Sequence, residues 1–381
     1  MTLFSKIEVK DKDLSSCLQG LFVSLLASDK IDALLIPRQL PHKAVVMPAL
    51  IYNPDDLAQA DPLAPAFPLN AARMASRLTK KRSGEKLGLV LRPCEIRAFI
   101  ELIKLRQGSL EDVVIIGMDC LGAYTNGDYA KFAETEGSTR RFYEQILGGR
   151  SGPVDGYELA GACTVCEHPV PENADIVIGL YGVDHATEIL VEAATSKGEA
   201  LVQGLNLPKA AEPAGRKKAI DALVSDRAAK RDKMMAETSA LTSSIEKLSH
   251  YLSRCVNCYN CRVACPVCYC KECVFVTDVF DHDPYQYLQW ARKKGNVKMP
   301  SDTDFFHLTR MAHIGLTCVG CGQCSNACPN DIPLMELFRT SAHAAQKAFG
   351  YEAGRRVDEP MPLAVFEKDE YEDIVGIKGA S

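Results

Sequence analysis

The feature that most constrains this chain is a stretch of nineteen residues, CVNCYNCRVACPVCYCKEC at 255–273, which holds seven cysteines. The whole chain has 16 cysteines in 381 residues. Its first residues, MTLFSKIEVKDKD, carry too many charges for the apolar core of a signal peptide. No apolar run approaches the roughly 20 residues that a membrane helix needs. We therefore expect a cytoplasmic protein whose thiols stay reduced, and we interpret the cysteines as metal ligands or redox groups rather than disulfides.

Two segments share the spacing C-x2-C-x2-C-x3-C-P, and they start at Cys255 and Cys318. This run binds a 4Fe-4S cube in ferredoxins, and in two-cluster ferredoxins the fourth cysteine of each run ligates the other cluster. The expected ligands are Cys255, Cys258, Cys261 and Cys328 for one cluster, and Cys318, Cys321, Cys324 and Cys265 for the other. Gly320 and Gly322 let the backbone approach closely. Zinc is the competing interpretation, but a tetrahedral zinc site has no use for the third cysteine or the C-P ending.

Three further cysteines of the opening stretch lie outside both runs, namely Cys268, Cys270 and Cys273. They are too closely spaced for chance burial, yet a cube needs a fourth ligand that the sequence does not identify. Three interpretations stay open, and we favour them in this order: ligands associated with a cluster, structural thiols packed beside the first cube, and a zinc site completed by His282 or His307.

The first half of the chain alternates strand-like and helix-like segments. Short apolar runs bounded by Gly, Pro or charges, such as EKLGLVLRP and LEDVVIIGMD, are typical of buried strands, and CEIRAFIELIKLRQ has helical spacing. We predict an α/β domain over residues 1–200. A charged helical connector over 201–245, to which we assign no site, leads to a mostly α-helical two-cluster ferredoxin domain over 246–347. An extended C-terminal tail over 348–381 completes the chain.

A second group of cysteines lies in the α/β half. Cys94 and Cys120 each follow a predicted strand, and Cys163 and Cys166 form a C-x-x-C before another. Ligands of open α/β sheets collect beyond the carboxyl ends of strands, so these four thiols can converge on one site. Four thiolates are a complete ligand set for one more 4Fe-4S cluster, with zinc or scattered buried cysteines as the alternatives.

The segments RPCEIRAFIEL, the strand ending in MDC, and CTVCE followed by ADIVIG resemble the beta subunits of coenzyme F420-reducing hydrogenase and of F420-linked formate dehydrogenase. The resemblance covers about residues 14–195. It implies that the proline-cysteine, the strand-end cysteine and the C-x-x-C bind a 4Fe-4S cluster beside FAD. The long helical insertion between the two ferredoxin runs resembles the module of the heterodisulfide reductase small subunit and of succinate dehydrogenase iron-sulfur proteins.

The flavin contacts that the family implies are less complete in this chain. The glycine-rich stretch near the start of the domain is reduced to SSCLQGLFVSLL, with Gly20 alone. Arg92 and Arg97, with Lys104, are the basic residues that can contact a cofactor phosphate. The sequence favours FAD over coenzyme F420, and no G-x-G-x-x-G fingerprint for a nicotinamide cofactor follows a strand.

We therefore expect an electron-transfer subunit of a cytoplasmic oxidoreductase complex with three 4Fe-4S clusters. Its expected partners are subunits of formate dehydrogenase, hydrogenase or heterodisulfide reductase type. The net charge of -5 gives no electrostatic reason to expect nucleic acid. Two alternatives stay open: a ferredoxin-dependent reductase of a small molecule, with Asp119, Glu95 or His168 as acid or base, and a structural zinc-binding interaction protein.

Overall fold

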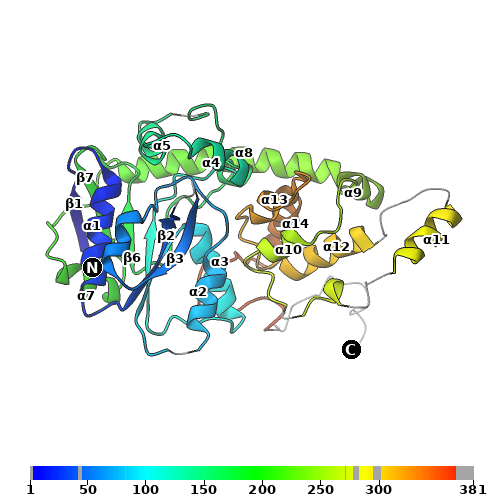
Figure 1. The fold of residues 1–381 in the computed structure, drawn as a ribbon, viewed down its shortest axis with the longest axis horizontal. Helices are drawn as coiled ribbons and strands as arrows, with labels where there is room; N and C mark the ends of the chain where they lie inside the picture. Colours follow the sequence, from blue (N-terminus) through cyan, green and yellow to red (C-terminus); the bar gives the residue numbers. More distant parts are fainter. Residues whose placement is uncertain are drawn as a thin grey trace, which may run out of the picture.

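The computed structural model describes residues 3–41, 45–81, 83–150, 152–270, 272–277, 283–294 and 302–365. The N-terminal part contains a seven-stranded sheet with the order β1-β7-β6-β5-β4-β2-β3 (Figure 1). Its strands are β1 (Leu3–Glu8), β2 (Ala33–Gln39), β3 (Val46–Ile51), β4 (Leu87–Leu91), β5 (Val113–Met118), β6 (Ile176–Gly179) and β7 (Glu188–Ala193). Strands β2, β4, β5 and β6 are parallel, so their carboxyl ends share one edge of the sheet.

Strands β4 and β5 coincide with the predicted strands EKLGLVLRP and LEDVVIIGMD, and all five residues of β4 are buried, as expected for a central parallel strand. Strands β1 and β7 were not predicted; they pair antiparallel at the edge of the sheet, from Leu3 opposite Ala193 to Glu8 opposite Glu188. The chain returns to β1 after residue 200, where the Lys6 N–H donates to the Pro208 carbonyl at 2.9 Å. The α/β fold therefore continues past the predicted boundary at residue 200.

Helices cover both faces of the sheet. In this domain they are α1 (Leu14–Leu26), the 3-10 helix η1 (Pro54–Gln59), α2 (Ala72–Thr79), α3 (Pro93–Lys104), α4 (Asn126–Phe132), α5 (Ser138–Leu147), α6 (Gly161–Thr164) and α7 (Ser196–Gly204). Successive strand residues point to opposite faces, so Leu34 joins the core with Phe22 of α1, while Leu35 joins the core with Phe99 of α3.

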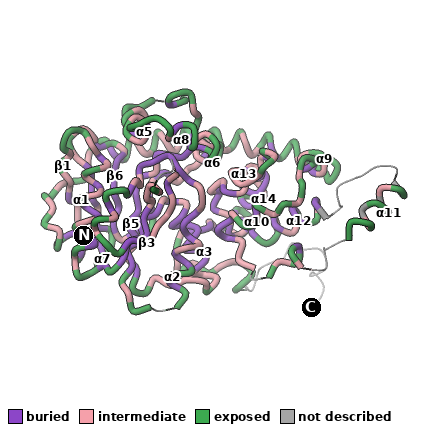
Figure 2. The backbone as a smooth tube through the Cα atoms, viewed as in Figure 1, coloured by how far each residue is buried: buried purple, intermediate pink, exposed green. Residues whose placement is uncertain are grey.

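The C-terminal half is helical. Its helices are α8 (Arg216–Leu241), α9 (Ile245–Tyr251), α10 (Asn260–Ala264), the 3-10 helix η2 (Val274–Val276), α11 (Pro284–Lys294), α12 (Asp302–Ile314), α13 (Gln323–Asn326) and α14 (Leu334–Ala348). Phe306 of α12 and Phe338 of α14 belong to the same buried cluster as Phe99 of α3. Buried residues therefore continue from α3 into α12 and α14 (Figure 2). The predicted fold class, an α/β domain followed by a mostly helical ferredoxin domain, is confirmed.

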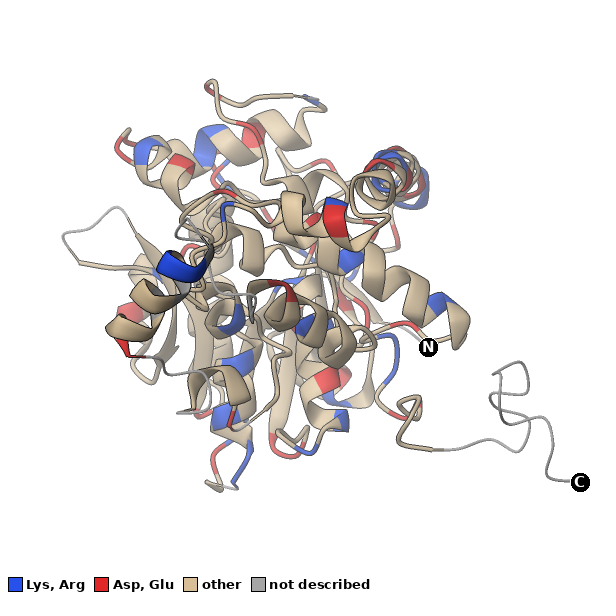
Figure 3. Cartoon of the chain, turned by 90° about the vertical axis from the view of Figure 1, so that its right-hand side faces the viewer, with Lys and Arg blue, Asp and Glu red and all other residues tan. Residues whose placement is uncertain are grey.

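Helix α8 runs along both parts of the molecule (Figure 1). Figure 3 views the molecule from one end and shows Lys and Arg interspersed with Asp and Glu over the described chain. Arg216 and Arg227 of α8 are nevertheless buried. The Arg216 guanidinium donates to both carboxylate oxygens of Asp119, at 2.6 and 3.0 Å. The prediction that this segment is only a solvated connector is therefore wrong at these residues.

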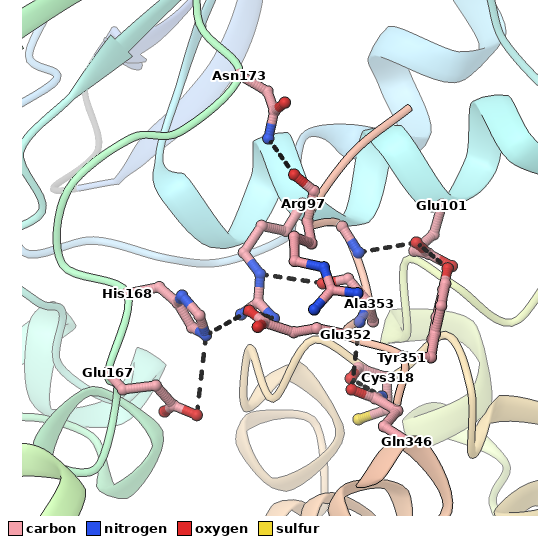
Figure 4. A network of polar contacts seen from close by, with 12 residues as sticks. Arg97, Glu101, Glu167, His168, Asn173, Cys318, Gln346, Tyr351, Glu352 and Ala353 are labelled. Carbon is pink, nitrogen blue, oxygen red and sulfur yellow. Dashed lines mark hydrogen bonds and ion pairs between the residues drawn. The ribbon is translucent and has the colours of Figure 1, made fainter. Parts of the chain in front are cut away.

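The residues that follow α14 return to the α/β domain (Figure 4). The Tyr351 hydroxyl donates to Glu101 of α3 at 2.7 Å, and the Gly354 N–H donates to the same carboxylate at 2.8 Å. The Arg97 Nε donates to the Ala353 carbonyl at 3.1 Å. This part of the predicted tail thus packs on α3, and residues 366–381 lie outside the described chain.

Of the helices in the described ranges, none combines the length and the apolar character that a membrane span requires.

Candidate metal centres

Cys94 lies in the first turn of α3, directly after β4. Pro93 occupies the first helical position, where a missing N–H removes no helical hydrogen bond. The Glu95 carboxylate accepts from the backbone N–H of Arg92 at 2.9 Å and of Ala71 at 2.7 Å. These hydrogen bonds fix the turn that places Cys94 at the carboxyl edge of the sheet.

The other three cysteines of the N-terminal group occupy loops at the same edge. Cys120 follows β5; its N–H donates to the Pro169 carbonyl at 2.7 Å, and its carbonyl accepts from the Tyr181 hydroxyl at 2.8 Å. Cys163 lies in the short helix α6, and the Cys166 N–H donates to its carbonyl at 3.4 Å. The loop that carries Cys120 and the segment that carries Cys163 and Cys166 are distant in sequence, and both are thereby held against the strand ends.

Cys94, Cys120, Cys163 and Cys166 line one cavity. The structure thus brings together the four residues that the sequence singled out. The same lining includes Phe67, Arg92, Gly122, Arg227, Gly320 and Cys321. Because Cys321 belongs to the second ferredoxin run, this cavity is where the two cysteine systems meet.

Burial, followed by the neighbouring Cys120 and Cys166, raises the pKa of Cys163 to about 12. The pKa of Cys94 lies well above its ordinary value for the same main reason, with Glu95 and then Cys120 adding to it. These thiols are therefore protonated at neutral pH without a metal, and a metal that binds them must displace the protons.

Two arginines face this cavity, the partly buried Arg92 and the buried Arg227. Arg92 donates to the carbonyls of Ala64 and Ala66 at 2.8 and 2.7 Å and to that of Gly122 at 3.2 Å. Burial alone would lower the pKa of Arg227, but neighbouring groups raise it above its ordinary value, Tyr181 and then Cys166 most strongly. Both cations are positioned to offset the negative charge of thiolates in the cavity.

The first ferredoxin run forms a second group. Burial raises the pKa of Cys261 to about 11, although Arg310 lowers it, and the other cysteines that raise it are Cys255, Cys258 and Cys328. This set is the crossed one that the ferredoxin rule predicts, with the fourth cysteine coming from the other run. Cys261 is buried while Cys258 is exposed, so this group reaches the surface.

The second ferredoxin run forms a third group with the same crossed composition. Burial raises the pKa of Cys318 to about 11, and Cys265 of the first run is the next largest cause. Cys265 likewise raises the pKa of Cys321 and of Cys324 after burial. Gly320 and Gly322 in this loop have φ of 67° and 80°, a region that glycine adopts without strain.

Buried polar atoms around these groups fit cluster sulfides. In the described part of the chain, His307 Nδ1, Arg310 Nε and Arg339 Nη1 are buried without a hydrogen-bond partner. His307 Nε2 lies 3.4 Å from Cys255 Sγ, and Arg310 Nη1 donates to Cys261 Sγ at 3.0 Å. Unpaired buried polar groups are costly unless an acceptor is supplied, and 4Fe-4S clusters carry acceptors on their sulfides.

Among the described residues, the three extra cysteines are not brought to His307, one of the two histidines that the sequence suggested. His307 contacts Cys255 instead, because α12 turns it toward the first ferredoxin group, and His282 lies outside the described residues. Cys270 Sγ lies 3.8 Å from His313 Nδ1, and burial followed by Cys265 raises the pKa of Cys268 to about 11. Over the described ranges, no three His, Cys, Asp or Glu side chains are close enough to hold a single metal ion.

The residues predicted to contact a flavin do not share a site. Gly20 lines an open cavity beside α1, Arg92 lines the cysteine cavity, and Arg97 lines a third cavity. A Cβ at Gly20 would meet nothing within 4 Å, so no close backbone approach occurs there. The guanidinium groups of both arginines bind backbone carbonyls of the protein itself. Lys104 likewise donates to the Tyr351 hydroxyl at 2.9 Å.

The acid and base candidates have structural partners. Asp119 accepts from Arg216 and from the backbone N–H of Leu180 at 2.8 Å, and the Glu95 carboxylate caps α3. His168 lies 3.4 Å from Glu352, and burial lowers its pKa to about 3 (Figure 4).

Apart from Arg92, the arginines near the cysteines were missed by the sequence analysis. Two of them come from α8, where Arg227 and Arg231 are four residues apart and so share one helical face. This spacing is the sequence signal that could have identified them. Arg310 of α12 and Arg339 of α14 carried no such signal, because neither has a second arginine on its own helix.

Comparison with known proteins is consistent with this arrangement. A family model described as a 4Fe-4S dicluster domain matches residues 251–332. The chain is similar to the F420-dependent formate dehydrogenase subunit beta of Methanocaldococcus jannaschii, with 27% identity over 369 residues that cover 90% of this chain and 92% of the relative. It is also 27% identical over 378 residues to the F420-dependent formate dehydrogenase 1 subunit beta of Methanococcus maripaludis, covering 91% and 92% of the two chains.

Among solved structures, a chain of the F420-reducing [NiFe] hydrogenase complex from Methanosarcina barkeri matches with a TM-score of 0.43 and 15% identity. The match covers 62% of this chain and 92% of that chain.

Proposed function

We propose that the chain holds three 4Fe-4S clusters in series. The premise is that it is a homologue of F420-dependent formate dehydrogenase beta subunits and an iron-sulfur electron-transfer subunit of an oxidoreductase complex. The cavity shared by the four N-terminal cysteines and Cys321 carries this proposal. The ligands are Cys94, Cys120, Cys163 and Cys166; Cys318, Cys321, Cys324 and Cys265; and Cys255, Cys258, Cys261 and Cys328.

The order of the three sites follows from their surroundings. Cys321 lines the N-terminal cavity, so the Cys318 group is its neighbour. Cys261 and Cys265 lie one helical turn apart at α10, which joins the Cys318 group to the Cys255 group. Cys258 is exposed, so the Cys255 group is the outer end of the series.

A 4Fe-4S cluster accepts and releases single electrons at a potential set by nearby hydrogen bonds, charge and solvent exposure. The residues of this chain govern those three factors. Arg92 and Arg227 place positive charge at the N-terminal cavity. Phe67, whose ring lies 5.3 Å from the Arg92 guanidinium, lines the same cavity with apolar surface and so keeps water from the thiolates.

The relatives are named as beta subunits of F420-dependent formate dehydrogenases, and we propose a catalytic subunit of that type as the partner. We place the protein in the cytoplasm, where free cysteines such as these stay reduced. The residues expected to hold FAD line three separate cavities and do not fit it, so we assign no role to a flavin in this chain.

Metal analysis of the full chain, purified anaerobically, tests the proposal. Three clusters require about twelve iron atoms per chain. The double variant Cys94→Ala/Cys163→Ala should retain about eight, because the two ferredoxin-type groups keep their ligands. Cys17→Ala is the matched control. The Cys17 thiol packs against the core that contains Phe22 and Leu34, and its removal should leave the iron content unchanged.

The iron content also separates the alternatives. Eight iron atoms in the unmodified chain, with no loss in the double variant, would remove the N-terminal cluster. A colourless preparation that contains zinc would replace the relay with a structural protein. Reduction of a small molecule by the isolated chain with reduced ferredoxin as donor would favour a stand-alone reductase.

A further inference from the structure

Arg310 is the most enclosed arginine of the ferredoxin domain. It projects from α12 and is 4% exposed. Its Nη1 donates to Cys261 Sγ at 3.0 Å and its Nη2 donates to the Cys261 carbonyl at 3.2 Å. The guanidinium carbon lies 4.3 Å from the centre of the Phe338 ring and 5.6 Å from that of Phe306, so aromatic faces fix its plane.

This guanidinium lacks the counter-charge that buried cations normally have. No carboxylate in the described ranges forms an ion pair with it. Burial alone would lower the pKa of Arg310, yet nearby cysteines raise that pKa above its ordinary value. These cysteines are Cys261, Cys265, Cys324 and Cys268. A buried cation without a partner is strongly unfavourable, so the thiolates must supply the compensation.

Three of these four cysteines belong to the two ferredoxin groups, and Cys268 lies outside both. Cys261 is a proposed ligand of the outer cluster, whereas Cys265 and Cys324 are proposed ligands of the middle one. Arg310 contacts Cys261 of the outer group directly, and Cys265 of the middle group follows one helical turn later at the end of α10. Its Nε is buried without a partner in the described part of the chain, which leaves one donor for a cluster sulfide.

We infer that Arg310 is a positioning residue that raises the reduction potentials of the two ferredoxin-type clusters, an inference that rests on the proposed function. Each reduction adds one negative charge to a cluster. A fixed positive charge in a dry, low-dielectric site stabilises the reduced form more than the oxidised form, and N–H donation to a ligand sulfur acts in the same direction. Because the charge of the cation acts on cysteines of both groups, it also offsets the repulsion between them when both are reduced.

Redox titration of the anaerobically purified full chain, followed by electron paramagnetic resonance of the reduced clusters, tests this inference. Arg310→Met removes the charge and the donors and should lower the ratio of reduced to oxidised ferredoxin-type cluster at least tenfold at a fixed applied potential, which is about 59 mV for one electron. Arg310→Gln keeps a donor without the charge and should shift the ratio in the same direction. Arg310→Lys keeps the charge and should change the ratio less than threefold.

The comparison of Lys with Gln decides the question even if the Met variant does not fold. If the ratio of reduced to oxidised cluster stays at the unmodified value in both Arg310→Met and Arg310→Gln, the inference is overturned. A shift in Arg310→Lys as large as that in Arg310→Gln also overturns it, because the effect would then come from packing. Arg292→Met on the exposed helix α11 is the matched control and should change nothing. If the unmodified chain gives no 4Fe-4S signals, the proposed function fails; if the signals are present and insensitive to Arg310, only this inference fails.

Discussion

At the scale of single residues, Gly322 joins two of the proposed cluster sites. The sequence indicated that this glycine permits a close approach, but it could not identify the approaching group, which lies 160 residues earlier in the chain. A Cβ built on Gly322 would lie 2.4 Å from the Cβ of Ala162, next to Cys163. The loop of one cysteine group thus rests directly on the helical turn that carries another.

Gly322→Ala should therefore disturb both groups. The new methyl would overlap Ala162, and the φ of 80° at position 322 is strained for alanine. We therefore expect a loss of at least about 1–3 kcal/mol in the free energy of unfolding. Denaturant unfolding of the anaerobic protein measures this loss. Gly127→Ala, where a Cβ meets nothing within 4 Å, should be close to neutral. Equal stability of the two variants would show that the contact is not a tight one.

At the scale of elements, α8 shows what a local pattern conveys and what it does not. Its helical state was predictable from composition, but its attachment was not, because the carboxylates that bind its arginines lie in distant loops. Arg216 binds Asp119, and Arg231 lies 3.2 Å from Glu167. The four N-terminal cysteines are the opposite case, since strand ends in a parallel sheet meet at one edge, and their convergence could be anticipated from the sequence.

Arg216→Met tests the attachment of α8. Removing one partner of a buried ion pair leaves the Asp119 carboxylate without its charge partner and should cost about 3–5 kcal/mol. Lys217→Met is the matched control, because Lys217 forms an exposed pair with Asp221 in which the side chains are 81% and 62% exposed; such pairs contribute below about 1 kcal/mol. Thermal unfolding of both variants provides the comparison, and equal shifts would contradict a specific role for the Arg216 pair.

At the scale of the whole molecule, the two predicted domains share a core. The pattern of cysteines and strands predicted both domains, but the sequence could not show that α3, α12 and α14 bury their apolar faces together, because the contacts join segments about 200 residues apart. Cys261 and Cys265 belong to this shared core, whereas the core around α1 on the opposite face of the sheet contains no proposed ligand. The two ferredoxin-type sites are therefore part of one core and not of the other.

Removal of iron by an anaerobic chelator should consequently destabilise the two cores unequally. Metal binding is coupled to folding where the ligands form part of the core, so backbone amides of α12 and α14 should exchange hydrogen faster in the iron-free protein. Amides of α1 should keep most of their protection. Hydrogen exchange measured by mass spectrometry resolves these segments, and a uniform increase across the chain would show that the cores respond as one unit.

The attachment of α8 also bears on the speed of internal electron flow. The helix is bound to the sheet through Arg216, packs on α14, and contributes Met234 to a small apolar cluster with Ala162 and Met335, where all three parts of the chain meet. A helix attached in this way to the α/β domain and to the helical domain leaves no hinge between them. Charge can then hop from site to site without waiting for a domain to swing, and a viscous solvent would slow only the encounter with the partner.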